Sequence, residues 1–485
     1  MSLKQKTVNG LTWSFLDNFA YQGITFLVGI VIARLVAPEE FGVIGMITLF
    51  IAISSTFVNS GFSSALIRKQ NATEIDYNTV FYFNLAVSFF FYFILFLASP
   101  YIADFFEEPR LILILRVLSL NLILSAFSIV QSVILSKKID FKKQAKISVC
   151  SSILSGAVGI VCAYQGMGVW ALVWRMVAGA FFSSFFLWVW GRWKPQLLFS
   201  WLSFKELFSF GSKLLLSSLL DTTFKNIYYP IIGKCFSPSS LGFYTRAESY
   251  CALFSSTLTG NIQRVTYPVL SSVQDNSELL KSTYKRLIKS TMLIAFTMML
   301  ALAATAKPLI LILIGDVWLP TVPFLQLMCF SAMFYPLHAL NLNAINVKGR
   351  SDLFLKLEII KKILTVPIIF IGIYWGIEAL LIGRIITSIV AYFLNSYYSA
   401  DLINYSTKEQ LKDILPSLGV ALVAAFSAWS ITFLDLNIWL TLGVQLLLGL
   451  GMVIGLCRLL KLAEYVELKT ILIENVNKLK NGIRK

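Results

Sequence analysis

The sequence has little of what most catalytic and metal sites are built from. It contains one histidine, His338, and its six cysteines stand singly in apolar stretches, with no CxxC or other paired spacing. Zinc sites and disulfide frameworks need such pairs, so we predict neither, and no metal or cofactor. We expect the cysteines to be small buried packing residues. His338 is expected to be a hydrogen-bonded packing residue, with a proton relay as the alternative.

Charge is also scarce, and this excludes most classes of soluble protein. Asp, Glu, Lys and Arg make up 14% of the 485 residues, whereas hydrophobic residues make up 57% and the mean hydropathy is +0.75. Soluble domains contain roughly 45–50% apolar residues by a broader count. The N-terminal MSLKQKTVNG is polar and the first apolar run is long enough to span a bilayer, so no cleavable signal peptide is expected. The composition indicates an integral membrane protein.

Long apolar runs are what the sequence has in abundance. Each run is too continuously apolar for the alternating pattern of a membrane β-strand, so we predict transmembrane helices of about 20 residues. Fourteen such helices are expected, beginning near Trp13, Phe41, Asn78, Leu111, Ile147, Val169, Leu207, Leu241, Leu287, Pro320, Leu357, Ile377, Ile414 and Ile438.

The positions of the basic residues predict the orientation of these helices. With the N-terminus in the cytoplasm, about three quarters of the 41 Lys and Arg residues fall on the cytoplasmic side. The expected outer connections are short and often acidic, as in ADFFEEPR. We therefore expect both termini to be cytoplasmic. Orientation and attraction to anionic lipid account for the net charge of +16, so no nucleic acid partner is predicted.

The chain also repeats itself. The proline and glycine of VAPEEFGVIG, Pro38 and Gly42, recur 200 residues later in FSPSSLGFYT. QSVILSKKIDF matches NAINVKGRSDL at an offset of 212, which places Asp140 over Asp352, and GVWALVWR matches GIEALLIGR at an offset of 208. Three matches in the same order, at a nearly constant offset, indicate an internal duplication.

The duplication predicts the architecture. Each repeat holds six helices, an even number, so both copies enter the membrane from the same side and are related by an axis along its normal. We expect an all-α integral membrane protein with an N lobe (1–200) and a C lobe (201–400) around a central cleft. Two extra helices (401–460) and a basic cytoplasmic tail (461–485) follow. Rocking of the lobes would open the cleft to each side alternately.

At this point the chain resembles a known family. The motifs NGLTWSFLDN, ARLVAPEEFGVIG, NSGFSSALIRK and LGFYTRAESY are similar to the polysaccharide-transporter branch of the multidrug/oligosaccharidyl-lipid/polysaccharide (MOP) exporter superfamily. The resemblance implies a Wzx-type flippase that moves undecaprenyl-pyrophosphate-linked oligosaccharide across the bacterial inner membrane for O-antigen, capsule or another surface polysaccharide. Its implied partners are that lipid-linked glycan, membrane lipid and other polysaccharide-assembly proteins. Lipid II flippases have an Arg-Asp pair where Val28 and Gly29 stand here, so that substrate is not carried over.

Charged side chains within the apolar runs are the candidate binding residues. A charge at mid-bilayer depth costs about 2.5–3.5 kcal/mol unless it faces protein or water. The resemblance implies that the first, second, seventh and eighth helices line the cleft. The candidates for binding the substrate headgroup are Arg246, Lys213 and Lys225. The candidates for cleft lining, ion pairing or coupling are Asp221, Glu248, Asp17, Asn18, Asn59 and Arg264.

Arg246 is the first of these candidates. It lies in YTRAE, which resembles the start of the eighth helix in lipid II flippases, where the arginine faces the cavity. A guanidinium offers planar, bidentate donors to a pyrophosphate. The structural alternative is an intramembrane ion pair of Arg246 with Glu248 or Asp221. Arg175 and Arg384, which are equivalent in the two repeats, are expected to be packing residues or interfacial anchors.

Three other functions compete with the flippase. A multidrug exporter of the same superfamily would share the fold but have a smaller, less cationic cavity. A membrane polymerase or ligase of the same pathway is expected to place catalytic groups in a sizeable outer loop. The sequence offers only short outer connections and no nucleophile–base pattern, so we do not expect an enzyme. A non-transporting scaffold would not need charges inside the bundle.

Overall fold

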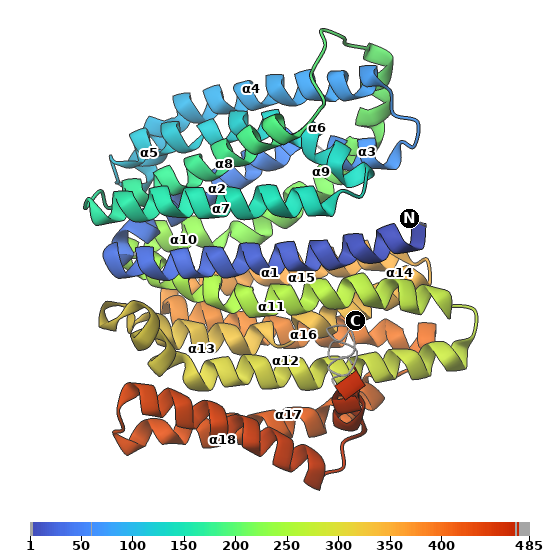
Figure 1. The fold of residues 1–485 in the computed structure, drawn as a ribbon. Coiled ribbons are helices and arrows are strands. Elements are labelled where there is room, and N and C mark those ends of the chain that lie inside the picture. Colours follow the sequence, from blue (N-terminus) through green and yellow to red (C-terminus); the bar gives the residue numbers. More distant parts are fainter. Residues whose placement is uncertain (1–2, 60, 471–472, 475–485) are drawn as a thin grey trace, which may run out of the picture. The chain divides into compact units, whose positions relative to one another are not determined.

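A computed structural model describes residues 3–59, 61–470 and 473–474, and within these ranges the chain is helical without β-strands (Figure 1). The prediction of an all-helical chain is confirmed. The first half contains α1 (Leu3–Leu35), α2 (Pro38–Asn59), α3 (Phe62–Arg68), α4 (Glu74–Phe106), α5 (Leu111–Leu118), α6 (Leu120–Lys137), α7 (Phe141–Tyr164), α8 (Val169–Trp190), α9 (Trp201–Asn226) and α10 (Tyr228–Cys235). The second half contains α11 (Pro238–Ser272), α12 (Ser277–Ile314), α13 (Thr321–Ala332), α14 (Tyr335–Val347), α15 (Ser351–Trp375), α16 (Ile377–Ile403), α17 (Thr407–Ser430) and α18 (Ile438–Leu459), with 3-10 turns at Asp316–Trp318 and Ile431–Leu434.

Eleven helical segments in the described part of the chain are long and apolar enough to cross a membrane. The other expected spans are present as helices, namely α9, α11 and α15, but their polar and charged residues keep them outside this group. Large apolar side chains on the segments stay exposed, as on α18, where Leu447 is 75% exposed. Apolar side chains that face outward along a whole helix are typical of contact with lipid. The chain is therefore a multi-pass membrane protein.

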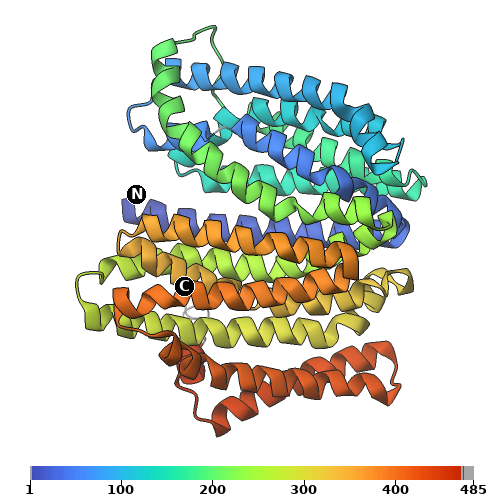
Figure 2. The same cartoon turned by 180° about the vertical axis from the view of Figure 1, so that it is seen from behind.

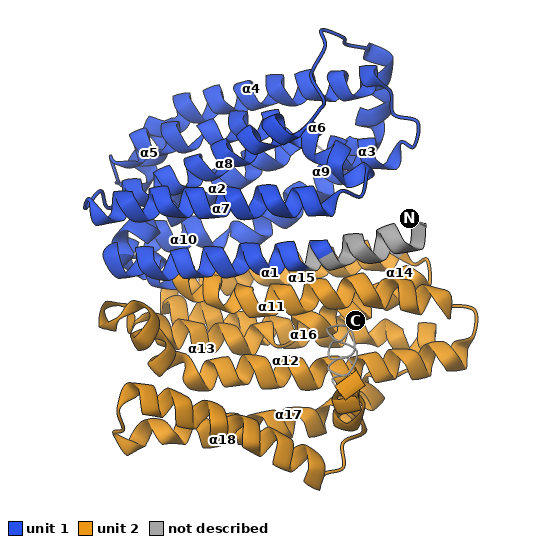
Figure 3. Ribbon diagram, viewed as in Figure 1, with its two compact units in different colours: residues 1–245 blue, residues 246–485 orange. Residues whose placement is uncertain are grey.

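The chain divides into two compact units, residues 1–245 and 246–485, and the division falls inside α11 (Figure 3). In the first unit α7 packs against α1 and α8, and α6 packs against α4 and α8. The helices α9 and α10 lie along α2 (Figure 2). One core cluster joins α1 to α7 and α8 through buried residues such as Ile32, Ala163 and Ala171. This apolar packing fixes the helices from which the site residues project.

In the second unit α12 packs against α13, α17 and α18, while α16 packs against α13, α14 and α15. Its interior contains a buried polar centre at Asn341 of α14. The Asn341 Oδ1 atom accepts hydrogen bonds from the hydroxyls of Tyr284 and Ser399, each at 3.0 Å, and from Gln410 Nε2 at 3.4 Å. The donors come from α12, α16 and α17, so one side chain ties four helices together. Buried polar groups need such partners because an unsatisfied group is costly away from water.

The duplication is visible in the helix boundaries. α2 and α11 begin 200 positions apart. α8 and α16 begin 208 positions apart, and each of these two helices follows a glycine with positive φ, Gly168 (54°) and Gly376 (98°). The fourth expected span of each repeat is divided into two helices, α5 and α6 in the first repeat and α13 and α14 in the second. α7 and α15 begin 210 positions apart, with Asp140 and Arg350 as their N-caps. The sequence alignment that placed Asp140 over Asp352 is therefore displaced by two residues, because the shared aspartates stand on different sides of the helix start.

Candidate functional site

The two copies of the proline–glycine motif lie against each other in the first unit. A β-carbon added to Gly42 on α2 would stand 1.8 Å from the carbonyl oxygen of Pro238 at the start of α11. A β-carbon added to Gly242 on α11 would stand 1.9 Å from the carbonyl oxygen of Pro38 at the start of α2. The contact is reciprocal, so it has a local twofold character. Only glycine allows two backbones to approach this closely.

Ion pairs lie next to this joint. Arg110, between α4 and α5, contacts Glu39 at 2.7 Å and Glu108 at 2.8 Å, and Lys234 on α10 contacts Glu107 at 2.7 Å. The hydrogen bond from Arg110 holds the pKa of Glu108 below its usual value, and the one from Lys234 does the same for the pKa of Glu107. The hydrogen bonds that Glu108 accepts from the Arg110 guanidinium in turn raise the pKa of Arg110. These charges therefore link the α4–α5 turn to the start of α2 and the end of α10.

The candidates on α9 are exposed. Lys213, Asp221 and Lys225 all present open side chains in the first unit. On the same helix the Thr222 hydroxyl lies 3.1 Å from the Thr56 hydroxyl of α2. This hydrogen bond fixes α9 against α2 while leaving the two lysines accessible. Both lysines are thus available to an anion.

Arg246 on α11 is buried, with 8% of its surface exposed. The centre of its guanidinium lies 5.6 Å from the ring centre of Trp318 and 5.9 Å from that of Tyr250. Aromatic faces attract a cation more strongly when water is excluded, so the two rings hold the charge in place. The aromatic surroundings were not predicted, because Trp318 lies 72 positions further along the chain.

Glu248 has a different partner from the one considered in the sequence. Arg384 of α16 donates to Glu248 Oε2 at 3.0 Å and to the Tyr335 hydroxyl at 3.1 Å. Arg384 was expected to be a packing residue or an anchor, and the structure adds an ion pair with Glu248, which we had considered as a partner of Arg246. The only available signal was an unexplained charge in an apolar run, and sequence spacing cannot reveal a partner on another helix.

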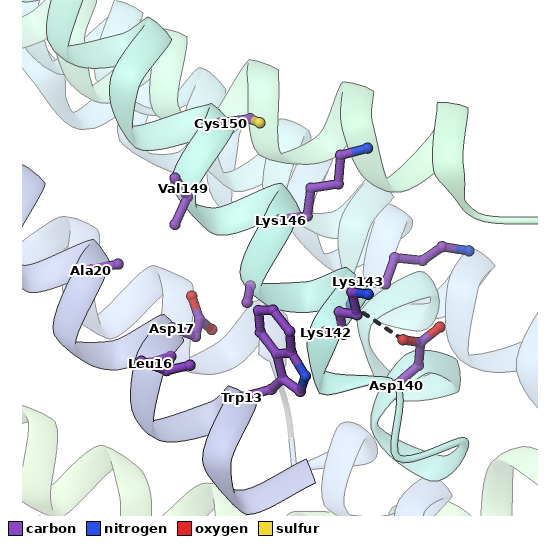
Figure 4. A pocket seen from close by; sticks show the side chains of 11 residues that line it. Trp13, Leu16, Asp17, Ala20, Asp140, Lys142, Lys143, Lys146, Val149 and Cys150 are labelled. Atoms are coloured by element: carbon purple, nitrogen blue, oxygen red, sulfur yellow. Dashed lines mark hydrogen bonds between the residues drawn. The ribbon is translucent and has the colours of Figure 1, made fainter. Parts of the chain in front are cut away.

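The remaining candidates are spread over three helices. Asn18 accepts a hydrogen bond from Gln22 within α1 at 2.9 Å, and the Asn59 amide donates to the Ser55 carbonyl oxygen within α2 at 3.0 Å. Asp17 lines a groove between α1 and α7 (Figure 4). Arg264 is exposed near the end of α11. Arg246 and Arg264 belong to the second unit, whereas Lys213 and Lys225 belong to the first, so a single cleft shared by these four residues stays a prediction.

The single histidine and the cysteines can also be placed in the structure. His338 Nε2 lies 3.1 Å from the Ser388 hydroxyl, as expected of a hydrogen-bonded packing residue. Three of the cysteines are buried and two are half-buried, but Cys235 is exposed, so the expectation of burial is wrong there. Within the described ranges, no three His, Cys, Asp or Glu side chains form a group that could hold a metal ion.

Comparison with known proteins identifies the family. Residues 31–323 match the family described as "Polysaccharide biosynthesis protein". The chain is 24% identical over 408 residues to the lipopolysaccharide biosynthesis protein WzxC of Escherichia coli (strain K12), covering 81% of this chain and 82% of that protein. It is 22% identical over 354 residues to the teichuronic acid biosynthesis protein TuaB of Bacillus subtilis (strain 168), covering 73% of each chain.

Solved structures share the fold. The lipid II flippase MurJ in an inward closed conformation aligns with a TM-score of 0.73 at 14% identity, over 93% of this chain and 98% of MurJ. An inward-facing MATE multidrug transporter of the MOP superfamily aligns with a TM-score of 0.61 at 18% identity, over 80% of this chain and 96% of the transporter. With the family match over more than half of its length, the chain belongs to the polysaccharide biosynthesis protein family.

Proposed function

We propose that the protein is a flippase that moves undecaprenyl-pyrophosphate-linked oligosaccharide units across the bacterial inner membrane for a surface polysaccharide. The observation that carries this proposal is a membrane bundle built from two copies of one helical unit, in a chain whose relatives are named for polysaccharide biosynthesis. A duplicated bundle can expose a central site to each side in turn. The relative ExoT of Rhizobium meliloti is named a succinoglycan biosynthesis transport protein, which supports transport rather than catalysis.

In this proposal all fourteen helical segments span the membrane, including the more polar α9, α11 and α15. Six form an N lobe (1–200), six form a C lobe (201–400), and α17 and α18 lie outside the duplication. Both termini are cytoplasmic, as the distribution of basic residues favours. The more polar helices are then the ones that face water and substrate, since charges are tolerated in a membrane where they do not face lipid.

The proposed cleft binds the anionic headgroup while the polyprenyl tail stays in lipid. Lys213 and Lys225, which are exposed, would attract the pyrophosphate, and Arg246 would bind it through its planar fork. Because Arg246 is only 8% exposed between two aromatic rings, it would contact the headgroup after those rings move. In such a step, the Arg246 guanidinium would leave the two aromatic rings and contact the pyrophosphate instead.

The reciprocal contact of Pro38, Gly42, Pro238 and Gly242 supports alternating access. The chain turns at this joint between α1 and α2 and again between α10 and α11, at the end of the helices where the predicted outer connections lie. In the proposed mechanism this contact closes the outer side and separates when the cleft opens outward. The ion pairs of Arg110 and Lys234 beside it would stabilise the closed arrangement.

The test is complementation of a bacterial strain that lacks the polysaccharide flippase of its own pathway. Expression of this chain should restore surface polysaccharide and remove the lipid-linked oligosaccharide that accumulates on the cytoplasmic side. Because the glycan specificity is open, several flippase-null strains with different repeat units are needed. If the chain instead restores a strain lacking its polymerase or ligase, in which the intermediate accumulates on the outer side, the protein is an enzyme and the proposal is wrong.

A further inference from the structure

A groove with a cavity volume of about 580 Å³ runs between α1 and α7 in the first unit (Figure 4). Leu16, Ala20 and Val149 contribute to an apolar floor. One wall lies where the candidate span of α1 begins, at Leu16, and the other lies at the start of the α7 span, at Phe141. The groove therefore sits at the boundary between the apolar part of a membrane and its headgroup layer.

Three lysines on the first turns of α7 border this groove. Lys142 and Lys146 are exposed and Lys143 is half-buried. Among the described residues, none of the three ammonium groups forms an ion pair with a carboxylate. In the second unit, by contrast, three lysines in the first half of α12 are neutralised by carboxylates, in the pairs Lys281–Glu409, Lys285–Asp413 and Lys289–Glu464. The charge at the groove is thus left for an external anion.

Aromatic rings hold two of these ammonium groups at the border. Lys142 Nζ lies 5.4 Å from the ring centre of Trp13 on α1, and Lys146 Nζ lies 4.3 Å from that of Trp190 on α8. Tryptophan prefers the interface between membrane and water, which agrees with the depth of the groove. The Asp140 carboxylate does not compete for an ammonium group here, since it caps α7 by accepting from the Lys143 backbone nitrogen.

Asp17 adds an acceptor to the same groove. Its Oδ1 atom is buried and, in the part of the chain described, has no hydrogen-bond partner. The carboxylate also interacts with the Ser148 hydroxyl. A buried unsatisfied acceptor calls for a donor. A phosphodiester offers only oxygen acceptors at neutral pH. A donor to Asp17 therefore has to come from hydroxyls elsewhere in the headgroup, while the phosphate meets the lysines.

We propose that this groove binds a phosphatidylglycerol-type phospholipid of the cytoplasmic leaflet. The phosphodiester contacts Lys142, Lys143 and Lys146, a glycerol hydroxyl donates to Asp17, and an acyl chain lies on the apolar floor. Basic pockets between transmembrane helices on this side of a membrane are suited to anionic headgroups. The placement in the cytoplasmic leaflet rests on the orientation in the proposed function, while the binding chemistry does not.

The experiment is lipid titration of the purified full-length protein in detergent, with bound lipid counted by native mass spectrometry. Dioleoyl phosphatidylglycerol should bind better than phosphatidic acid and much better than phosphatidylcholine. The double variant Lys142→Gln/Lys146→Gln should bind phosphatidylglycerol about thirtyfold more weakly, since each basic residue near anionic lipid contributes about 1 kcal/mol and about 1.4 kcal/mol corresponds to a factor of ten. Ala20→Trp, which keeps every charge but fills the groove, should give a similar loss.

A matched control is Lys408→Gln/Lys412→Gln. These lysines are exposed and occupy the same second and sixth positions of α17 that Lys142 and Lys146 occupy in α7. The control should keep wild-type lipid binding. An equal loss in the control, or equal binding of phosphatidylglycerol and phosphatidylcholine by the wild type, overturns the proposal.

Asp17→Leu should remove the preference for phosphatidylglycerol over phosphatidic acid while leaving phosphate binding in place. Displacement of phosphatidylglycerol by undecaprenyl pyrophosphate at a stoichiometric amount would assign the groove to the transport substrate, and our assignment would be wrong. The result is independent of the proposed function, because lipid binding is measured without transport. Failure of the wild type to complement a flippase-null strain bears on the function alone.

Discussion

Gly42 lies against the backbone of Pro238 so closely that a β-carbon on Gly42 would stand 1.8 Å from the Pro238 carbonyl oxygen. The copies of these residues repeat the contact with roles exchanged, Gly242 against Pro38. A motif that recurs 200 positions along the chain thus packs on its own copy. The duplication explains the symmetry of the contact, and the absence of side chains at both glycines explains its closeness.

A methyl group at this joint should therefore impair both packing and transport. We predict that Gly42→Ala or Gly242→Ala destabilises the closed joint by about 1–3 kcal/mol, because the backbone must move to relieve the clash. Export in the complementation assay should fall strongly, with protein levels checked by blot. Gly260→Ala on α11 and Gly23→Ala on α1 are matched controls, since a β-carbon at either position meets no atom within 4 Å. Full export and an unchanged melting temperature for Gly42→Ala would show that the joint need not close.

Arg246 should be required for export. We predict that Arg246→Ala abolishes complementation and that Arg246→Lys restores only part of it, because lysine keeps the charge but loses the bidentate fork. Arg458→Ala, which removes an exposed charge from α18 outside the duplication, should have little effect. Full export by a well-expressed Arg246→Ala protein would exclude this arginine as the headgroup ligand.

Asn341 should be critical for the stability of the second unit. Replacement by leucine removes the acceptor shared by Tyr284, Ser399 and Gln410 and leaves their donors buried. We expect a loss of about 1–3 kcal/mol, observed as a lower melting temperature in detergent. Asn343→Leu on the same helix is the control, because the buried Nδ2 of Asn343 has no hydrogen-bond partner among the described residues. Equal losses in the two variants would contradict a specific role for Asn341.

The ion pairs near the joint should make stability depend on pH. The pKa of Glu108 is lowered by Arg110, so its stabilising contribution is fully present above the unfolded-state pKa of about 4.3 and is lost as pH falls through the lower folded-state value. The contribution is below about 1 kcal/mol, since Arg110 is 42% exposed. In a melting-temperature series from pH 6 to pH 3, Arg110→Leu should lose less stability than the wild type. Parallel curves for the two proteins would show that the pair contributes nothing.

The sequence by itself determined the helices, because long apolar runs in a membrane can satisfy their backbone hydrogen bonds only within a helix or a closed barrel. Every expected run coincides with a helix or a broken pair of helices, and the break occurs in the same segment of both repeats. The duplication was visible in the sequence because both copies retain the glycines and prolines that their backbones require. The sequence alignment of the two copies was wrong by two residues at Asp140, because an N-cap is defined by where a helix starts and not by residue identity.

Tertiary structure decided which charged groups meet. Glu248 could have paired with any nearby cation, and only the packing of α11 and α16 selects Arg384, 136 positions away. The same holds for Arg246, whose charge the sequence identified but whose aromatic neighbour Trp318 comes from a separate turn. Ion pairs and cation–π contacts between helices depend on rotation and depth, and apolar periodicity specifies neither. The residue types that could act were therefore readable from the sequence, whereas their partners were set by helix packing.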